Sequence, residues 1–330
     1  MKTKFVLFSA IACGAILFSS CGSTTFAISS GDESLTALTK VTDNEEPCIT
    51  PYGGDDGRDL YFAARESKKY YNIYKKENAF SQSMAQKTSG KNFNISPTFC
   101  AKTDKIAFKC QNEGSSTSDI FLMSNSKSAA LSPITESSDA YEGHPSFSPD
   151  GTLIVYDKVQ YSYYKSFSTL GGLLFGAVNT VVVKNSELWV KNLKTNETIL
   201  LGNGSQPRFS PDGKRIAYVK YSSDAQSCSI WTMDIDGSNP VQVTDAKKGF
   251  ATSPCWSPDG SKILFSSYKK DKKDYDLYVI GIDGNGLMQL TKNKSYDDYP
   301  YWTRDGYIYF TSDRGGKSGN YQIWRFKYGN

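Results

Sequence analysis

One phrase recurs along this chain, and its repetition constrains the fold more than any other feature of the sequence. The segments HPSFSPDG, QPRFSPDG, SPCWSPDG and YPYWTRDG each carry a glycine six residues after a proline. The same spacing fits a segment at Pro51 and, with Thr103 in place of the glycine, one at Pro97. Six copies of one unit therefore begin at Pro51, Pro97, Pro145, Pro207, Pro254 and Pro300. The spacing between these prolines is typical of proteins in which copies of one small supersecondary unit stack against each other.

Two further landmarks follow each proline. An apolar residue in NIY, DIF, ELW, SIW, DLY or QIW lies 22 or 23 residues after the proline in five copies, but 43 residues after it in the third. Four copies then close with a threonine, at Thr88, Thr135, Thr244 and Thr291. In SPDG, Pro at the second and Gly at the fourth position are typical of a type I turn followed by a left-handed residue, which joins antiparallel strands. Each copy is predicted to be a four-stranded antiparallel meander.

The phase of the repeat predicts a closed ring. One small sheet cannot bury both of its faces alone, so copies of this length pack radially as the blades of a β-propeller. We predict an all-β, six-bladed propeller of four-stranded antiparallel blades over residues 35–330. The last copy stops after its third strand, in QIWRFKYGN, whereas LTALTKVTDN precedes the first copy. We expect the N-terminal strand around Thr39 to Thr42 to join the last blade and close the ring.

The N-terminus has the layout of an export signal. A basic start, MKTK, precedes an apolar run from Phe5 to Phe18 and small residues that end at Cys21. The segment resembles a bacterial lipoprotein signal, so we predict that residues 1–20 are removed and that Cys21 is lipidated; an ordinary cleaved signal is the alternative. Residues 21–34 are expected to form a flexible tether. This predicts an exported protein anchored by lipid in the cell envelope, in the periplasm or at the outer membrane or cell surface.

The charge and the cysteine content limit the classes of ligand and cofactor that we expect. Without the two lysines of the signal, 36 basic residues face 34 acidic ones, which gives no electrostatic basis for binding nucleic acid. The cysteines after the signal show no CxxC spacing, so we expect buried thiols and neither a metal nor a cofactor. These cysteines are Cys48, Cys100, Cys110, Cys228 and Cys255.

The repeated phrase also resembles a known family. Pro-x-Trp/Phe-Ser-Pro-Asp-Gly, followed by an apolar strand, Asp-Ile-Tyr and a closing Leu-Thr, is similar to the WD40-like repeat of the TolB-type propeller family, as is YFTSDRGG at residues 309–316. The resemblance covers about residues 35–330 and implies a periplasmic protein that binds other envelope proteins. That family has an additional N-terminal α/β domain, whereas only about 13 residues separate Cys21 from the first closing strand. We therefore expect a stand-alone propeller rather than a role in the Tol system.

The same resemblance extends to enzymes, for which the chain lacks the expected residues. Propellers of this kind precede the catalytic domain of prolyl-oligopeptidase-like peptidases, but the sequence has no GxSxG motif and a single histidine. Oligogalacturonate-lyase-like enzymes use a metal site built from several histidines, which one histidine cannot supply. A carboxylate site for Ca²⁺ near Asp139, Glu142, Asp297 and Asp298 is the remaining alternative to acids that only face water. We predict no catalytic residues and no metal ligands.

Variation between the copies indicates where a ligand would bind. The residues just before the repeat prolines are all polar and differ around the ring, which predicts a polar ring at the mouth of the central funnel. One interpretation is that this ring binds a peptide, a glycan or a loop of a partner protein. The other is that it is only the hydrated rim of a channel. Its members, with the neighbouring acids, are Thr50, Ser96, Glu142, His144, Gln206, Ser253, Asp297, Asp298 and Tyr299.

The third copy carries about 20 extra residues, within an insertion at about residues 160–185. Because a loop between second and third strands opens on the same face as the predicted ring, the insertion would lie beside it. It is the most apolar loop of the chain, which favours a partner or membrane surface; the alternative is a long hairpin folded down over the propeller. The candidate contact residues are Tyr163, Tyr164, Phe167, Leu173, Leu174 and Phe175.

These observations predict a monomeric, non-enzymatic binding or scaffold module at the bacterial cell envelope. It would engage an envelope protein, a peptide or a glycan through the funnel face and the insertion. The alternative is an enzyme of polysaccharide or peptide metabolism with its site in the funnel, which would need two carboxylates about 5 to 10 Å apart, or a metal.

Overall fold

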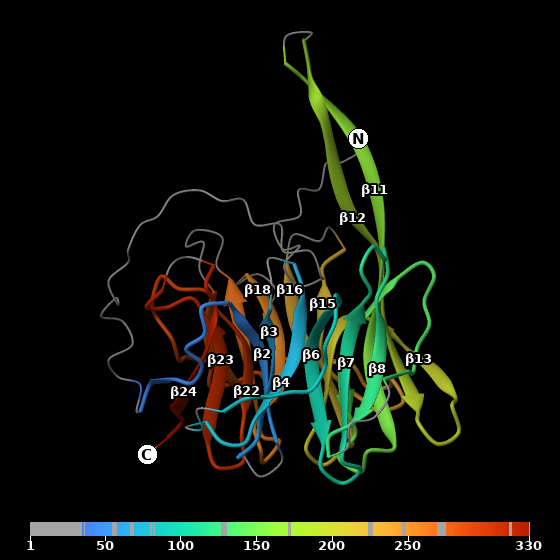
Figure 1. The fold of residues 1–330 in the computed structure, drawn as a ribbon. Helices are drawn as coiled ribbons and strands as arrows, with labels where there is room; N and C mark the ends of the chain where they lie inside the picture. Colours follow the sequence, from blue (N-terminus) through green and yellow to red (C-terminus); the bar gives the residue numbers. More distant parts are fainter. Residues whose placement is uncertain are drawn as a thin grey trace.

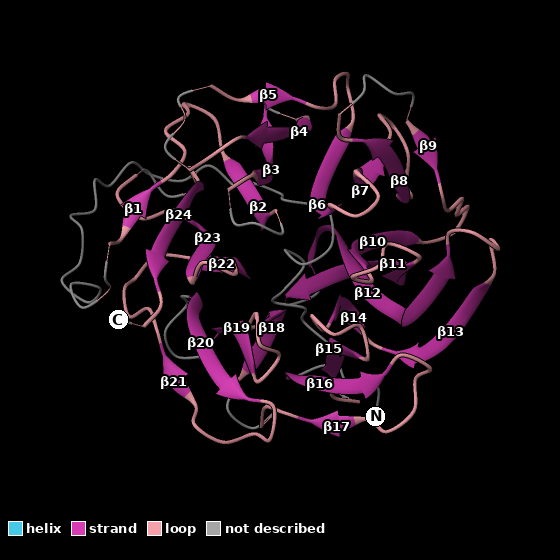
Figure 2. Ribbon diagram, turned by 90° about the horizontal axis from the view of Figure 1, so that it is seen from below, coloured by secondary structure: helices cyan, strands magenta, loops and turns pink. Residues whose placement is uncertain are grey.

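The fold is all-β in a computed structural model that describes residues 35, 37–54, 58–66, 69–79, 81, 83–126, 131–170, 173–223, 227–245, 249–268, 275–316 and 319–329. For residues 162–170, 173–182 and 184 it describes the backbone alone. The described strands stand around a central axis (Figures 1 and 2), with a long hairpin rising from one face. The predicted propeller is thus confirmed, and its elements follow the repeat.

Within the described residues the strands form six successive four-stranded antiparallel meanders. Single parallel pairings, Tyr71 with Phe93 and Cys228 with Phe250, join the first meander to the second and the fourth to the fifth. The first is β2 (Cys48–Gly53), β3 (Leu60–Arg65), β4 (Tyr71–Lys76) and β5 (Ala85–Gln86), and the second is β6 (Phe93–Cys100), β7 (Lys105–Gln111), β8 (Asp119–Ser124) and β9 (Ser132–Pro133). The third is β10 (Tyr141–Phe147), β11 (Leu153–Leu170), β12 (Leu173–Asn192) and β13 (Thr198–Asn203). The fourth is β14 (Ser205–Phe209), β15 (Arg215–Tyr221), β16 (Cys228–Asp234) and β17 (Val241–Gln242). The fifth is β18 (Phe250–Trp256), β19 (Lys262–Tyr268), β20 (Tyr275–Gly281) and β21 (Met288–Gln289), and the sixth is β22 (Asp297–Trp302), β23 (Tyr307–Ser312), β24 (Gln322–Lys327) and β1 (Thr39–Lys40).

The N-terminal strand closes the ring, as predicted. Strand β1 pairs antiparallel with β24, with Thr39 opposite Arg325 and Lys40 opposite Trp324. The backbone N–H of Val41 then donates to the carbonyl of Ile323 over 2.8 Å. Chain segments from the two ends of the sequence therefore share one sheet, and the edge of β24 is covered.

The core lies between neighbouring meanders, where apolar faces meet. One cluster joins Val155 and Leu188 of the third meander to Ile216 and Tyr218 of the fourth. The five cysteines after the predicted signal are all free and buried, as expected of small apolar residues. Burial raises the pKa of the Cys228 thiol to about 12, so it stays protonated at neutral pH.

The SPDG segments form the predicted turns. In the third meander the N–H of Gly151 donates to the carbonyl of Ser148 over 2.8 Å, and Gly151 has a φ of 71°. The Ser148 hydroxyl donates to Asp150 and accepts from the N–H of Leu153, which fixes the start of the next strand. In the second copy the left-handed residue is Asp104, with a φ of 51°, one position later than the Thr103 that the spacing predicts.

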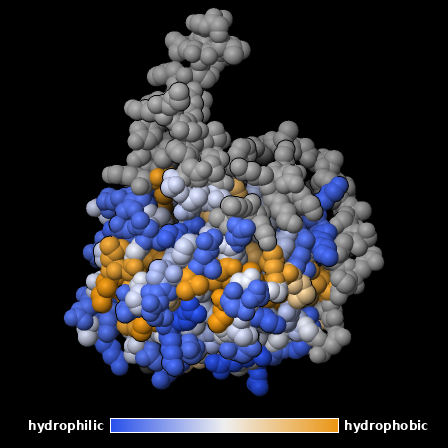
Figure 3. All heavy atoms as spheres, turned by 180° about the vertical axis from the view of Figure 1, so that it is seen from behind, coloured by the Kyte–Doolittle hydropathy of each residue, from blue (hydrophilic) through white to orange (hydrophobic). Residues whose placement is uncertain are grey.

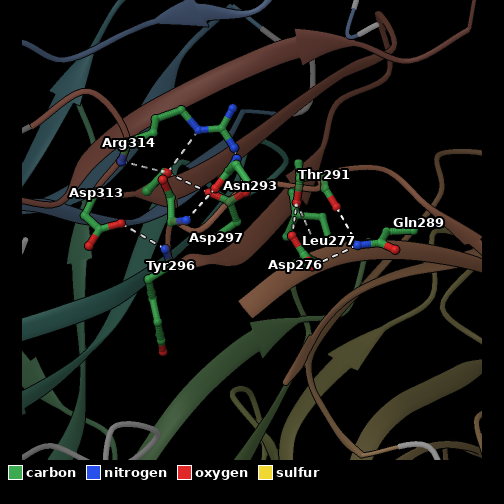
Figure 4. Close-up of polar contacts among 11 residues, drawn as sticks. Asp276, Leu277, Gln289, Thr291, Asn293, Tyr296, Asp297, Asp313 and Arg314 are labelled. Atoms are coloured by element: carbon green, nitrogen blue, oxygen red, sulfur yellow. Dashed lines mark hydrogen bonds and ion pairs between the residues drawn. The ribbon is translucent and has the colours of Figure 1, made fainter. Parts of the chain in front are cut away.

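The closing threonines have a structural role that we call the threonine lock. In five meanders the threonine lies just after the short fourth strand, and its hydroxyl oxygen accepts the N–H of an isoleucine or leucine near the start of the third strand (Figure 4 shows Thr291 with Leu277). The pairs are Ile73 with Thr88, Ile120 with Thr135, Ile230 with Thr244, Leu277 with Thr291 and Ile323 with Thr42, at 2.8 to 2.9 Å. The third meander has no threonine there and instead extends β13 to six residues.

The insertion forms the upper part of β11 and β12. Tyr161 is paired with Val183, and the pairing continues to Leu170 and Leu173, with irregularities after Gln160 and after Phe167. The hairpin rises from the ring rather than folding down over it (Figure 1). Because β11 leaves the turn at Ser148 and climbs to the hairpin tip, the SPDG turns and the tip lie on opposite faces, here named the lower face and the upper face.

Candidate functional site

The structure brings the six residues before the repeat prolines together on the central axis. Thr50, Ser96, His144, Gln206, Ser253 and Tyr299, here named the axial ring, line one cavity. We expected them in loops at the mouth of the funnel, and this prediction was wrong. Each of them lies inside an innermost strand, at a β-bulge. In β10, for example, the pairing with β11 shifts between Gly143 and Ser146, around His144. The ring therefore lies midway along the channel, and five of its members are buried.

Every member of the axial ring has a left-handed backbone. The φ angles lie between 47° for His144 and 54° for Ser96. A residue before proline ordinarily adopts an extended conformation, and a non-glycine residue in the left-handed region costs about 1–3 kcal/mol. Such a conformation persists only where surrounding contacts enforce it.

Hydrogen bonds from one meander to the next supply those contacts. The N–H of Thr50 donates to Thr311 over 3.1 Å, and the N–H of Ser96 donates to the Thr50 hydroxyl over 3.2 Å. Further round, the N–H of Ser253 donates to Oε1 of Gln206 over 2.7 Å. Two ring side chains, those of Thr50 and Gln206, therefore serve as acceptors that join neighbouring meanders, a role that sequence reasoning missed.

His144 forms a buried pair with Asp157 of β11. Nδ1 of His144 lies 2.9 Å from Oδ2 of Asp157, which also accepts the N–H of Gln206 over 2.9 Å. Because a carboxylate only accepts, Nδ1 carries a hydrogen and Nε2 is the nitrogen left for a ligand. Burial favours the neutral acid, but the electrostatic attraction and hydrogen bond of His144 outweigh it and hold the pKa of Asp157 below its ordinary value.

The axial cavity is too small for a peptide or a sugar. Its volume is about 20 Å³, whereas one water molecule already needs about 10–15 Å³. Only a water or an ion of similar size fits at this level. A larger ligand has to bind above or below the ring.

The three acids grouped with the ring lie outside this cavity. Glu142 is 4% exposed, with Nζ of Lys158 3.7 Å away, and burial raises the pKa of its carboxyl group. Asp298 accepts the N–H of Tyr299 over 2.7 Å and the Tyr296 hydroxyl over 2.9 Å, and burial raises its pKa too. Both acids are held by nearby protein groups rather than aimed into the axial cavity.

Asp297 belongs to a structural network of the sixth meander (Figure 4). Its carboxylate is fully buried, pairs with Arg314 over 2.6 Å and accepts the Ser312 hydroxyl over 2.6 Å. Asn293 donates to the same carboxylate over 3.3 Å. A carboxylate with these partners has its charge satisfied within the protein, so Asp297 is a poor candidate for a ligand contact.

Sequence reasoning missed a larger cavity on the lower face. This lower cavity has a volume of about 150 Å³ and is formed by the residues that follow the repeat prolines. Aromatic side chains line it, including Phe147, Phe209, Trp256 and Trp302, together with the guanidinium-bearing Arg208 and Arg304. The sequence holds a signal for it, since Arg208 replaces the small residue of HPSF and SPCW, and Arg304 replaces the proline of SPDG.

The outer wall carries a third candidate surface, seen from behind in Figure 3 as apolar patches among hydrophilic ones. A groove of about 450 Å³ between the fourth and fifth meanders is lined by Val243, Phe265, Tyr278 and others. Large exposed apolar side chains lie on the outer strands or beside them: Ile199, Leu200, Ile235, Val241, Leu287 and Met288.

Other predicted features fall outside what the structure describes. Cys21 and the signal lie in residues that are not described, and for the contact residues of the insertion only the backbone is described. Among the described residues, no group of three or more His, Cys, Asp or Glu could hold a metal ion. In the same part of the chain no helix is long and apolar enough to cross a membrane.

Comparison with known proteins assigns the fold. Residues 194–330 match the family model described as TolB beta propeller domain. Putative TolB from Agrobacterium tumefaciens is 18% identical with a TM-score of 0.59 over 88% of this chain and 93% of that one. Oligogalacturonate lyase from Vibrio parahaemolyticus is 16% identical with a TM-score of 0.56 over 91% and 96%. The chain has the fold of a TolB-like β-propeller.

A curated relative matches a shorter part of the chain. Hydrazine synthase subunit alpha from Kuenenia stuttgartiensis is 30% identical over 120 residues, which make up 35% of this chain and 11% of that protein. The chain thus spans about a tenth of the length of this relative.

Proposed function

We propose that this chain is a non-enzymatic binding module of the bacterial cell envelope, exported, anchored through a lipid on Cys21, monomeric and six-bladed. The observation that carries the proposal is the lower cavity, an aromatic-lined hollow on the axis with two arginines at its wall. Concave apolar sites with a few polar groups are the usual binding sites of proteins. A TolB-like fold, whose solved examples include both TolB and enzymes, is compatible with this role.

The proposal assigns different contacts to the two faces. The lower cavity takes a segment of a partner protein, and the hairpin reaches away from the upper face (Figure 1). The sequence of the hairpin is uncharged from Ser166 to Val183, so a partner or membrane surface would suit it. A module with contacts on opposite faces acts as a scaffold.

A hairpin-shortened variant tests this proposal. Because Tyr161 and Val183 are opposite each other, replacing residues 162–182 by Asn-Gly joins them through a tight turn that suits an antiparallel pair. We expect this variant to fold with an unchanged melting temperature and to lose crosslinks to an envelope partner that the full chain retains. Identical crosslinked partners for the two proteins would refute a contact role for the hairpin.

The enzyme alternative rests on one observation, the Asp157–His144 pair beside the axial cavity. A carboxylate that orients a histidine is a recurring feature of general base sites. The small cavity and the acceptor role of Asp157 in the meander junction favour a structural pair instead. Turnover of peptides or acidic oligosaccharides that disappears in His144→Gln while the melting temperature is retained would support the enzyme.

A further inference from the structure

The charges around the lower cavity define what kind of segment it takes. Among the residues that line it there is no aspartate and no glutamate, whereas Arg208 and Arg304 both contribute. Arg208 is half-buried, and its guanidinium donates to the carbonyl of Pro145 over 3.2 Å. Neither arginine forms an ion pair with a described carboxylate. A partly buried guanidinium without a counterion has a free energy cost that an anionic ligand would offset.

Just outside the cavity the charge reverses. The turn residue Asp150 follows the lining residue Pro149, and Asp212 and Asp259 occupy the same place in the next two meanders. The serine hydroxyl and turn amides around Asp150 and Asp259 lower the pKa of each carboxyl group to about 2. Ionised carboxylates therefore border the arginine-bearing centre at three successive meanders, whereas Lys102 takes this place in the second.

This pattern separates two kinds of anion. A polyanionic glycan would place several negative charges against the rim aspartates, where like charges repel. A protein segment with one acidic side chain between basic or neutral neighbours has charges opposite to those of both the arginine-bearing cavity and the aspartates outside it. The volume of about 150 Å³ is well below the ~300–1,000 Å³ of sites for drug-sized ligands, so it suits one inserted side chain.

We propose that the lower cavity binds a single carboxylate side chain of a partner protein, between Arg208 and Arg304, with the flanking residues of that partner on the aspartate rim. The planar guanidinium group suits a carboxylate because it donates two parallel hydrogen bonds. Aromatic walls that include Trp256 and Trp302 exclude water around the pair. This inference rests on the proposed binding function and names the chemistry of its ligand.

The test uses a short peptide and the tryptophans of the chain as reporters. Acetyl-Lys-Glu-Lys-amide is titrated into protein labelled with ¹⁵N at tryptophan, and acetyl-Lys-Gln-Lys-amide and trigalacturonate are titrated separately. Trp256 and Trp302 line the cavity, whereas Trp189, Trp231 and Trp324 are not among its lining residues and act as internal controls. We expect a saturable shift of the first two indole signals with the glutamate peptide alone.

Variants locate the contact. Arg304→Gln changes an exposed residue and should keep the fold. We expect it to lower the affinity for the glutamate peptide about tenfold, because it removes a charge-assisted hydrogen bond. Arg208→Gln should have a similar or larger effect. The control Lys191→Gln/Lys194→Gln removes two positive charges from the third meander, outside the cavity, and should leave binding unchanged.

The outcomes are separable. Equal shifts with the glutamine peptide, shifts of all five tryptophans, binding of trigalacturonate alone or no saturable shift in the millimolar range would each overturn the carboxylate inference. If such a result were obtained while the hairpin-dependent crosslinks to a partner were still observed, the proposed binding function would be supported and only the carboxylate site would be wrong.

Discussion

The threonine lock makes a quantitative prediction about stability. Thr244 is 7% exposed, and its hydroxyl oxygen accepts the N–H of the fully buried Ile230 over 2.8 Å. Valine has nearly the same shape but no acceptor, so Thr244→Val leaves a buried N–H without a partner. Such a loss costs about 1–3 kcal/mol of unfolding free energy. In a domain of this size it corresponds to a fall in melting temperature of several degrees.

A serine variant separates the hydrogen bond from packing. Thr244→Ser keeps the acceptor and removes one methyl group, so it should cost about 1 kcal/mol or less. Both variants are compared with the native chain by calorimetry and by urea unfolding at equal protein concentration. If Thr244→Val unfolds like the native protein, or if serine is as damaging as valine, the landmark threonine is not a hydrogen-bond acceptor that stabilises the sheet.

Further measurements check other features. Gly151 has a φ of 71°, and a Cβ there would lie 2.6 Å from the Thr103 side chain, so Gly151→Ala should lower the melting temperature more than Gly260→Ala, whose nearest neighbour is 3.8 Å away. Burial raises the pKa of Asp298 above its unfolded value, so native stability should rise as pH falls through that raised pKa; in urea titrations, Asp298→Asn should lack this rise and be more stable at pH 7. Ile199 is 60% exposed on the edge strand β13, and light scattering should show that Ile199→Lys delays heat aggregation without lowering the melting temperature.

Most of the fold follows from the sequence because its determinants are local. The SPDG turns, the strand alternation and the phase of the last copy predict the meanders and the pairing of β1 with β24. The direction of the hairpin does not follow, because an apolar two-stranded ribbon suits a rising or a folded position equally well. The left-handed residue at Asp104 was not predicted either, because the turn of the second copy has the same length as that of the third but its turn hydrogen bond, from the N–H of Asp104 to the carbonyl of Ala101, lies one residue later.

The candidate site was predicted in part. Equivalent positions in a ring of repeats converge on its axis, so the meeting of His144 with its five counterparts could be anticipated. Their burial could not, because proline ordinarily imposes an extended conformation on the residue before it, and the bulge that reverses this depends on acceptors from the neighbouring meander. The lower cavity was overlooked because its residues were assigned to strand and turn alone.

The axial ring also limits how such a protein can be rebuilt or can evolve. Four of the left-handed residues, Thr50, Ser96, Gln206 and Ser253, donate their amide to a side chain that the preceding copy supplies, as Gln206 does to Asp157 and Ser253 does to Gln206. A copy moved by itself would leave one amide without an acceptor and remove the acceptor of another. These copies are therefore not interchangeable parts, and a shuffled or lengthened version would need matched changes on both sides of any junction that carries such a bond.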